Sequence, residues 1–202
     1  MKRVTRNADR LAGRLQAEGW TALSGSLRSQ PSSDDDQIIK RIEAITEGPL
    51  PPTLRAFWAE AGGIDLVWNY NAKEEMPDLG VDVPLAEMDP LCVEPAQFAE
   101  VLFEDWELEK QEADPGRFEP FDLALSPDEL HKIDVSGGPP YGIELPFFGA
   151  DPIFANEPHE LPFLEYLRLC FRWAGFPGLE AYGDRADVRT FVQRFGQDLE
   201  PF

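Results

Sequence analysis

The chain has 202 residues, of which 43% are hydrophobic and 11% aromatic, a composition typical of one folded domain and not of a disordered chain. It carries 38 acidic and 18 basic residues, a formal net charge of −20. Nucleic acids and anionic membranes attract Lys and Arg, so this charge argues against both as partners.

The charge is unevenly distributed along the chain. Residues 1–41 hold eight basic and five acidic residues, a net of +3, whereas residues 42–202 hold ten basic and thirty-three acidic residues, a net of −23. A small domain needs a net charge of only about 2–8 for solubility, and the excess causes self-repulsion in the folded state. The sequence leaves two explanations open: a cationic partner, or a strongly acidic cell interior.

The two cysteines, Cys92 and Cys170, lie in apolar stretches and are expected to be free and buried, without a disulfide. The basic start of the chain is not followed by the apolar segment of a signal peptide, and no apolar run approaches the roughly 20 residues that span a bilayer. We therefore expect a cytoplasmic protein.

The first predicted element is a helix over residues 7–18, which Gly19 ends, followed by a polar linker over residues 24–35. We expect residues 1–35 to form an N-terminal arm of this short helix and linker. Residues 36–202 are then a single domain with a C-terminal helical extension.

Two helices are predicted next. Ser32 or Ser33 can cap the first, and the acidic run that follows suits the positive end of a helix dipole better than a metal site. The second begins at Pro51 and ends at Gly62. Their apolar positions share one face of each helix: Ile38, Ile42 and Ile45, then Leu54, Phe57, Trp58 and Ala61.

Alternating apolar residues predict short strands near residues 64–68, 91–93 and 121–125. Between them, a helix from Pro95 should bury Phe98, Leu102 and Trp106. A hairpin is expected from Ile133 and Val135, through a Ser-Gly-Gly-Pro-Pro turn, to a return strand with Tyr141, Ile143 and Leu145. Helices near residues 162–174 and 188–195 follow. The fold class is therefore α+β: a mostly antiparallel sheet with helices packed on it and helices at both termini.

The segment Leu50-Pro51-Pro52-Thr53-Leu54-Arg55-Ala56-Phe57-Trp58, closed by Gly62-Gly63, resembles the opening of the SUKH superfamily, which includes Smi/Knr-type regulators and bacterial immunity proteins. The later stretch Phe147-Phe148-Gly149-Ala150-Asp151-Pro152, leading into Pro162-Phe163-Leu164-Glu165-Tyr166-Leu167, is similar to the family's end. The resemblance covers roughly residues 36–180. The hairpin block around Gly137-Gly138, the N-terminal arm and the final helix depart from the family pattern and put the subfamily in doubt.

This resemblance implies a sheet with helices packed on it, no enzymatic activity and a binding role. Bacterial members typically neutralise a nuclease or deaminase toxin by covering its active site. The charge leads to a similar expectation, because a nuclease presents Lys and Arg where it grips phosphate and an acidic surface can mimic that phosphate.

We expect no catalytic site, no metal and no cofactor. His131 and His159 with two distant cysteines do not make a zinc spacing. Ser136 five residues after His131 lies on the predicted hairpin and lacks the nucleophile-elbow pattern. Lys132 is expected to form an ion pair with a nearby carboxylate.

The candidate binding surface for a basic protein partner is the acidic stretch after residue 99, together with an aromatic residue at the hairpin edge. Its members are Glu100, Glu104, Asp105, Glu107, Glu109, Glu112, Asp114, Glu119, Asp122 and Tyr141.

Two alternatives come from other classes. A small hydrolase or transferase would use the carboxylates Asp89 and Asp151 in one cleft. A regulatory or scaffold protein would self-associate weakly as a homodimer through its last helix, burying the stripe Val188, Phe191, Val192 and Phe195 against a second copy.

Overall fold

The computed structural model describes residues 1–112 and 120–202. The elements of the first half are α1 (Lys2–Ala17), β1 (Arg28–Ser29), α2 (Asp35–Thr46), α3 (Pro52–Glu60), β2 (Gly63–Asp65), α4 (Leu85–Met88), β3 (Cys92–Val93), η1 (Ala96–Leu102) and α5 (Phe103–Glu112). Those of the second half are β4 (Phe121–Ser126), η2 (His131–Ile133), β5 (Tyr141–Leu145), α6 (Phe163–Arg172), η3 (Pro177–Tyr182) and α7 (Ala186–Gly196).

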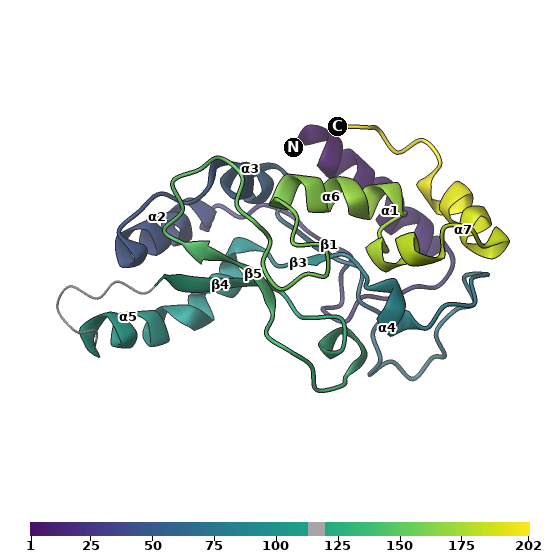
Figure 1. Ribbon diagram of the computed structural model, residues 1–202, viewed down its shortest axis with the longest axis horizontal. Coiled ribbons are helices and arrows are strands. Elements are labelled where there is room, and N and C mark those ends of the chain that lie inside the picture. The colour runs from purple at the N-terminus through teal and green to yellow at the C-terminus, as the bar shows by residue number, and fades with distance from the viewer. Residues whose placement is uncertain (113–119) are drawn as a thin grey trace.

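The fold is α+β, as predicted, with helices at both termini. The described strands form two small antiparallel sheets: one has the order β1-β2-β3, and the other pairs β4 with β5. In Figure 1, helices α1, α3 and α6 lie along one side of the strands and α5 lies along the other. None of the helices in the described ranges combines the length and apolar character that crossing a bilayer requires.

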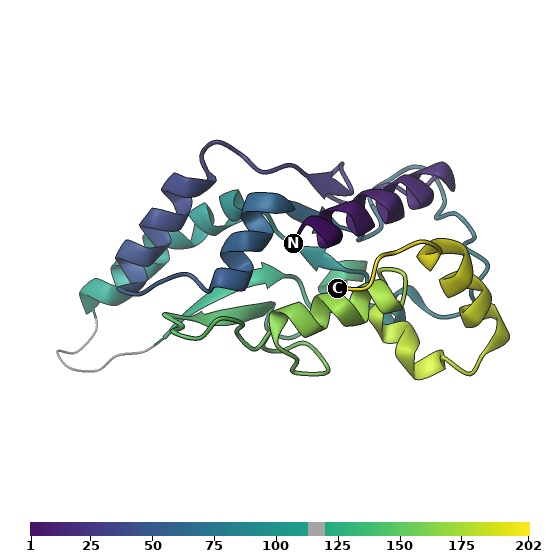
Figure 2. The same cartoon turned by 90° about the horizontal axis from the view of Figure 1, so that it is seen from above.

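Helix α1 begins earlier than predicted and packs into the common core. Val4, Ala8, Leu11 and Leu15 repeat at helical spacing and are fully or almost fully buried within the core that the rest of the chain forms. The opposite side of this helix carries the arginines that give the first 41 residues their positive charge. The N-terminal segment therefore lies against the body of the protein (Figure 2).

The basic side chains of α1 bind the C-terminal segment. Arg6 and Arg10 both pair with Glu200, and Arg14 pairs with Asp198. Buried Asn7 donates to the carbonyl of Glu200 at 2.9 Å and accepts its backbone N–H at 2.8 Å. These contacts bring the two ends of the chain together and neutralise part of the acidic charge.

Residues of the predicted linker supply strand β1, which pairs with β2. Gly62, just before β2, has φ +75°, and an added Cβ would lie 2.1 Å from the carbonyl oxygen of Ser29. Only glycine combines this left-handed conformation with so close an approach. The glycine expected to end helix α3 therefore also seats the linker against the first sheet.

The predicted hairpin is wrong in its first strand. Residues 131–133 form the short 3-10 helix η2, and β5 pairs with β4 instead. The cause is Asp128, whose Oδ1 accepts the backbone N–H groups of Leu130 and His131 and turns the chain into a helical bend. This bend also directs Lys132 inward.

The helix predicted from Pro95 is present but divided. Its first part, η1, is a 3-10 helix, and α5 follows directly. Phe103 and Trp106 are buried, and the Trp106 ring packs 5.5 Å from that of Phe121. Phe98, expected in the core, is 42% exposed because the tighter 3-10 winding rotates it away.

The last helix packs inside the chain. Val188, Phe191 and Phe195 are buried in the core, with the Phe191 ring 5.4 Å from that of Phe176. Val192 is partly buried. The apolar stripe of α7 that was predicted to form a homodimer interface is therefore buried within the chain itself.

Candidate functional site

The predicted acidic surface is centred on helix α5. Glu104, Asp105, Glu109 and Glu112 all lie on its exposed side, and Glu100 is exposed in η1. Within the described ranges, none of these five carboxylates forms an ion pair. Asp114 and Glu119 lie outside the described residues.

Two apolar side chains interrupt this acidic surface. Val101 is 65% exposed and Leu108 is 53% exposed. They are seven residues apart, a spacing that places them on one side of a helix. Glu104 and Asp105 lie between them in the sequence and on the same side. We call this set of side chains, Val101, Glu104, Asp105, Leu108 and Glu112, the α5 face.

Two basic residues fasten α5 to neighbouring elements without covering the α5 face. Arg41 of α2 donates to Glu107 at 3.0 Å, and its guanidinium lies 4.5 Å from the centre of the Phe103 ring. Lys110 pairs with Glu47 at 2.7 Å, a contact that lowers the pKa of this carboxyl. Glu107 is thus paired within the protein, whereas the other acids of α5 form no ion pair with any residue in the described ranges.

Asp122 and Tyr141 do not join the α5 face. Asp122 is exposed on β4, directly opposite Glu144 of β5, so that two like charges face each other across the strands. Tyr141 is fully buried, because β5 pairs with β4 and turns this side chain toward the core. The expectation that Tyr141 meets a partner at the surface is therefore wrong.

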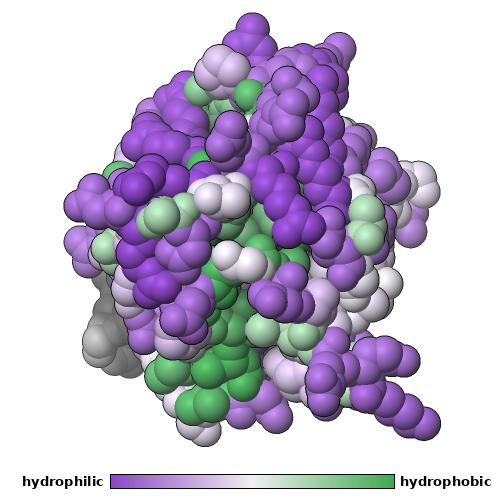
Figure 3. All heavy atoms as spheres, turned by 90° about the vertical axis from the view of Figure 1, so that its right-hand side faces the viewer, coloured by the Kyte–Doolittle hydropathy of each residue, from purple (hydrophilic) through white to green (hydrophobic). Residues whose placement is uncertain are grey.

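A second candidate site is a pocket between α4, η2 and η3, with a volume of about 420 Å³. On the end of the molecule that faces the viewer in Figure 3, hydrophobic residues are exposed between hydrophilic ones. The close packing of α4 and η3 depends on Gly178, where an added Cβ would lie 2.0 Å from the carbonyl oxygen of Glu87. The lining residues are Ala86, Glu87, Asp89, Glu129, Leu130, Pro158, His159, Pro177, Gly178, Glu180, Ala181 and Tyr182.

Two of the pocket's carboxylates are held by buried donors. Lys132 is fully buried and its Nζ lies 2.5 Å from Oδ1 of Asp89, itself 5% exposed. The Tyr141 hydroxyl donates to Oε2 of Glu129 at 2.6 Å. Burial, together with the negative charges of Asp89 and Glu129, raises the pKa of Tyr141 and keeps it a donor.

His159 is oriented by two further carboxylates. Its Nδ1 lies 3.1 Å from Oε2 of buried Glu157, and its Nε2 lies 3.3 Å from Oε2 of Glu180 in the pocket wall. Glu157 also accepts the backbone N–H groups of His159 and Leu161. The imidazole is therefore fixed between the core and the pocket.

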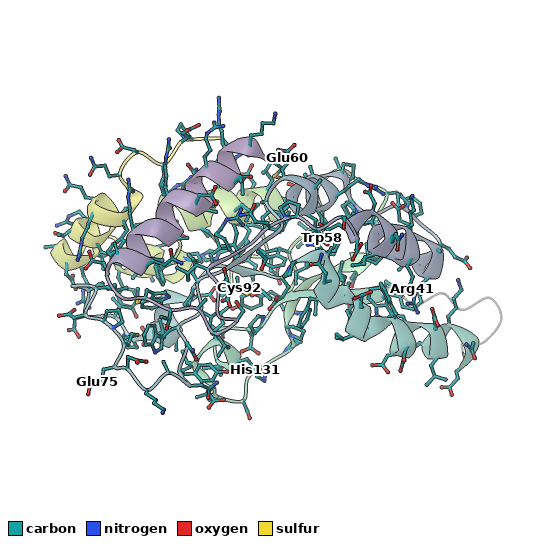
Figure 4. The ribbon with its side chains drawn as sticks, turned by 180° about the vertical axis from the view of Figure 1, so that it is seen from behind. Arg41, Trp58, Glu60, Glu75, Cys92 and His131 are labelled. Atoms are coloured by element: carbon teal, nitrogen blue, oxygen red, sulfur yellow. The ribbon has the colours of Figure 1, made fainter. Side chains whose placement is uncertain are left out.

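The remaining sequence candidates have separate structural roles. Asp151 accepts the backbone N–H of Leu164 at the start of α6 and does not line the pocket with Asp89. His131 binds Asp128 through Nδ1 at 2.7 Å, and within the described ranges it makes no hydrogen bond to Ser136. Figure 4 shows His131 near the edge of the molecule. In residues 1–112 and 120–202 no three His, Cys, Asp or Glu side chains are arranged to hold a metal.

The thiols follow the sequence prediction. Cys92 and Cys170 are both free and buried. Burial raises the pKa of each thiol well above its ordinary value, because the charged thiolate is disfavoured away from water.

No family model, curated protein or solved structure matches this chain. The membership of the SUKH superfamily that residues 50–63 suggest therefore stays a prediction.

Sequence reasoning missed the buried group behind the pocket. Lys132 was expected to pair with a nearby carboxylate, but its partner Asp89 is 43 residues away. The Asp89-Pro90 step indicated only a turn. The sequence indication of this buried pair is a lysine directly before the alternating apolar residues Ile133 and Val135. The strand predicted for those residues gave no reason to expect that Lys132 is buried.

Proposed function

We propose that the chain is a non-enzymatic binding domain and that its α5 face docks a basic protein. The observation that carries this proposal is the pairing of two exposed apolar side chains, Val101 and Leu108, with carboxylates on the same helix side. An apolar centre inside a polar rim is the usual anatomy of a protein interface. A partner with Lys or Arg around an apolar patch fits this arrangement.

Electrostatics supports the same assignment. Three arginines of α1 form ion pairs with acidic residues of the C-terminal segment. These arginines therefore do not neutralise the carboxylates of α5. Opposite charges steer partners together and raise association rates toward about 10⁸–10⁹ M⁻¹s⁻¹ at low salt. In this proposal a basic partner relieves the self-repulsion of the net charge of −20.

The biological role that we infer is immunity to a toxin. The resemblance of residues 50–63 to the SUKH superfamily supports it, because bacterial members of that group bind nuclease or deaminase toxins. A nuclease active site is rich in Lys and Arg and suits an acidic partner. We place this activity in the cytoplasm, where the free thiols Cys92 and Cys170 stay reduced.

The proposal is tested by co-expressing the chain with a candidate nuclease or deaminase toxin of basic character. We expect a stable complex that protects the cells and weakens more than tenfold between 50 and 500 mM salt, because exposed charge contacts are screened. The double variant Glu104→Lys/Leu108→Lys should abolish protection. Failure of the two proteins to bind at low salt, or an affinity insensitive to salt, contradicts the proposal.

The matched control is Glu75→Lys/Met76→Lys, which also replaces one exposed acid and one exposed apolar side chain and changes the net charge by the same +3. Glu75 is also acidic and exposed, but Figure 4 shows it at the opposite end of the molecule from Arg41, the residue that is fastened to α5. This variant should bind and protect as the unaltered chain does. Equal loss in both variants indicates that net charge alone, and not the α5 face, controls the interaction.

A further inference from the structure

We propose that the pocket between α4, η2 and η3 binds a guanidinium or primary ammonium group carried on an apolar stem. This inference is independent of the proposed function, because the pocket shares no lining residue with the α5 face.

The charge of the pocket selects a cation. Four of its lining residues are acidic, Glu87, Asp89, Glu129 and Glu180, and none is Lys or Arg. Lys132 lies behind Asp89 and is fully buried. Arg185 lies over the ring of Tyr182, 5.9 Å from its centre, and its charge is balanced by Asp187 at 2.8 Å. With Lys132 counted, three formal negative charges remain around the cavity, so an anionic ligand is disfavoured.

The two innermost carboxylates keep free acceptor atoms. Asp89 receives Lys132 at Oδ1, and within the described ranges its Oδ2 accepts no hydrogen bond although its side chain is only 8% exposed. Glu129 receives Tyr141 at Oε2 and has Oε1 left. A carboxylate offers about four lone-pair sites, and in the described ranges neither of these two oxygens is among the buried side-chain atoms that lack a partner, so both are open to solvent and to a ligand. A planar guanidinium carries several N–H donors and suits carboxylate oxygens of this kind.

The rest of the wall suits an apolar stem. Ala86, Leu130, Pro158 and Pro177 line the cavity together with the ring of Tyr182. A volume of about 420 Å³ lies in the range of cavities that hold small organic ligands. The described residues place no three metal-ligating groups together here, so the arrangement favours an organic cation over a metal ion.

The positions of the carboxylates are set before any ligand arrives. Lys132 and Tyr141 hold Asp89 and Glu129 from the buried side, and Gly178 allows η3 to pack directly on the end of α4. Such preorganisation reduces the conformational entropy lost on binding. The buried ion pair thus has a second role besides its place in the core.

The test is an NMR titration of the full chain with butylguanidinium, compared with butylurea, which is uncharged and of nearly the same shape. We expect saturable shifts at Tyr182 and His159 and at least fivefold tighter binding of the guanidinium compound. Glu129→Gln still accepts the Tyr141 hydroxyl, so it should fold normally and weaken binding at least fivefold. Glu75→Gln is the control and should leave the affinity unchanged.

A second variant and a second ligand complete the experiment. Ala181 is an exposed lining residue, so Ala181→Trp should close the pocket and abolish binding without unfolding the protein. A capped Gly-Arg-Gly peptide that binds as tightly as butylguanidinium identifies the ligand as a protein side chain. Weaker binding of the peptide identifies a free small molecule. Equal affinity for butylurea, or shifts that persist in Ala181→Trp, overturns the proposal.

Discussion

The α5 face and the pocket between α4 and η3 are both acidic, but they use their carboxylates differently. At the pocket, Asp89 is held by Lys132, Glu129 by Tyr141 and Glu180 by His159. On the α5 face, Glu104, Asp105 and Glu112 are exposed to solvent, and among the described residues only Glu107 beside them is paired, with Arg41. Acids near the core need partners because an unpaired buried charge is costly, whereas hydrated acids do not. Equal acidity therefore belongs to carboxylates held in place by internal partners in one region and to carboxylates exposed to solvent in the other.

The largest expected effect is at the buried ion pair. Lys132→Met leaves Asp89 as an unpaired charge in the core and should lower the free energy of unfolding by about 3–5 kcal/mol. Chemical denaturation monitored by Trp fluorescence measures it. Adding Asp89→Asn to this variant should restore much of the loss, because the uncompensated charge is removed. If the free energy of unfolding of Lys132→Met lies within about 1 kcal/mol of that of the unaltered protein, the proposed difference between the two regions is contradicted.

Glu94 sharpens the comparison because it is a largely buried acid that lies near another acid. Burial, and then the negative charge of Asp65, raise the pKa of Glu94 to about 6. Between pH 4.5 and 6 the folded state holds a proton that the unfolded state has lost, so stability present below pH 4.5 should fall as pH rises through 6. About 1 kcal/mol is expected after allowing for partial solvent screening.

The measurement for Glu94 is the difference in unfolding free energy between the unaltered protein and Glu94→Gln over this pH range. The glutamine variant removes the titrating group and leaves the other carboxyls in place, so the difference isolates Glu94. A difference that is flat with pH, or that changes in the opposite direction, would show that the Glu94 carboxyl is well solvated in the folded protein.

The smallest effect is expected on the α5 face. Replacing Glu104, Asp105 and Glu112 by their amides reduces the net charge from −20 to −17, since each substitution removes one negative charge. Each change should alter the unfolding free energy by less than about 0.5 kcal/mol. Glu107→Gln, which breaks the pair with Arg41, should cost up to about 1 kcal/mol. Thermal melts of the three single variants, the triple variant and Glu107→Gln test this order. A large loss in the triple variant would assign the α5 face a structural role.

Local patterns in the sequence predicted much of the architecture. The apolar stripes of α2, α3, α6 and α7 lie in the core, and the free buried thiols and the exposed acids of α5 are where the residues indicated. These features depend on helical periodicity and on the cost of burying charge, both of which are readable from neighbouring residues. Phe98 shows the limit, because a 3-10 turn shifts a side chain that an α-helix would bury.

By itself the sequence determined an acidic α+β chain with a predicted surface for a cationic partner. Only the tertiary structure decided that β5 pairs with β4 and that Tyr141 is buried. It also decided that Lys132 pairs with Asp89, 43 residues away in the sequence, on the buried side of a pocket. The physical reason is that charge and periodicity are local properties, whereas strand pairing and the partners of buried polar groups are chosen by contacts between distant segments. The sequence predicted that Lys132 pairs with a nearby carboxylate, and the tertiary structure instead buries this lysine against Asp89, a distant carboxylate in the core.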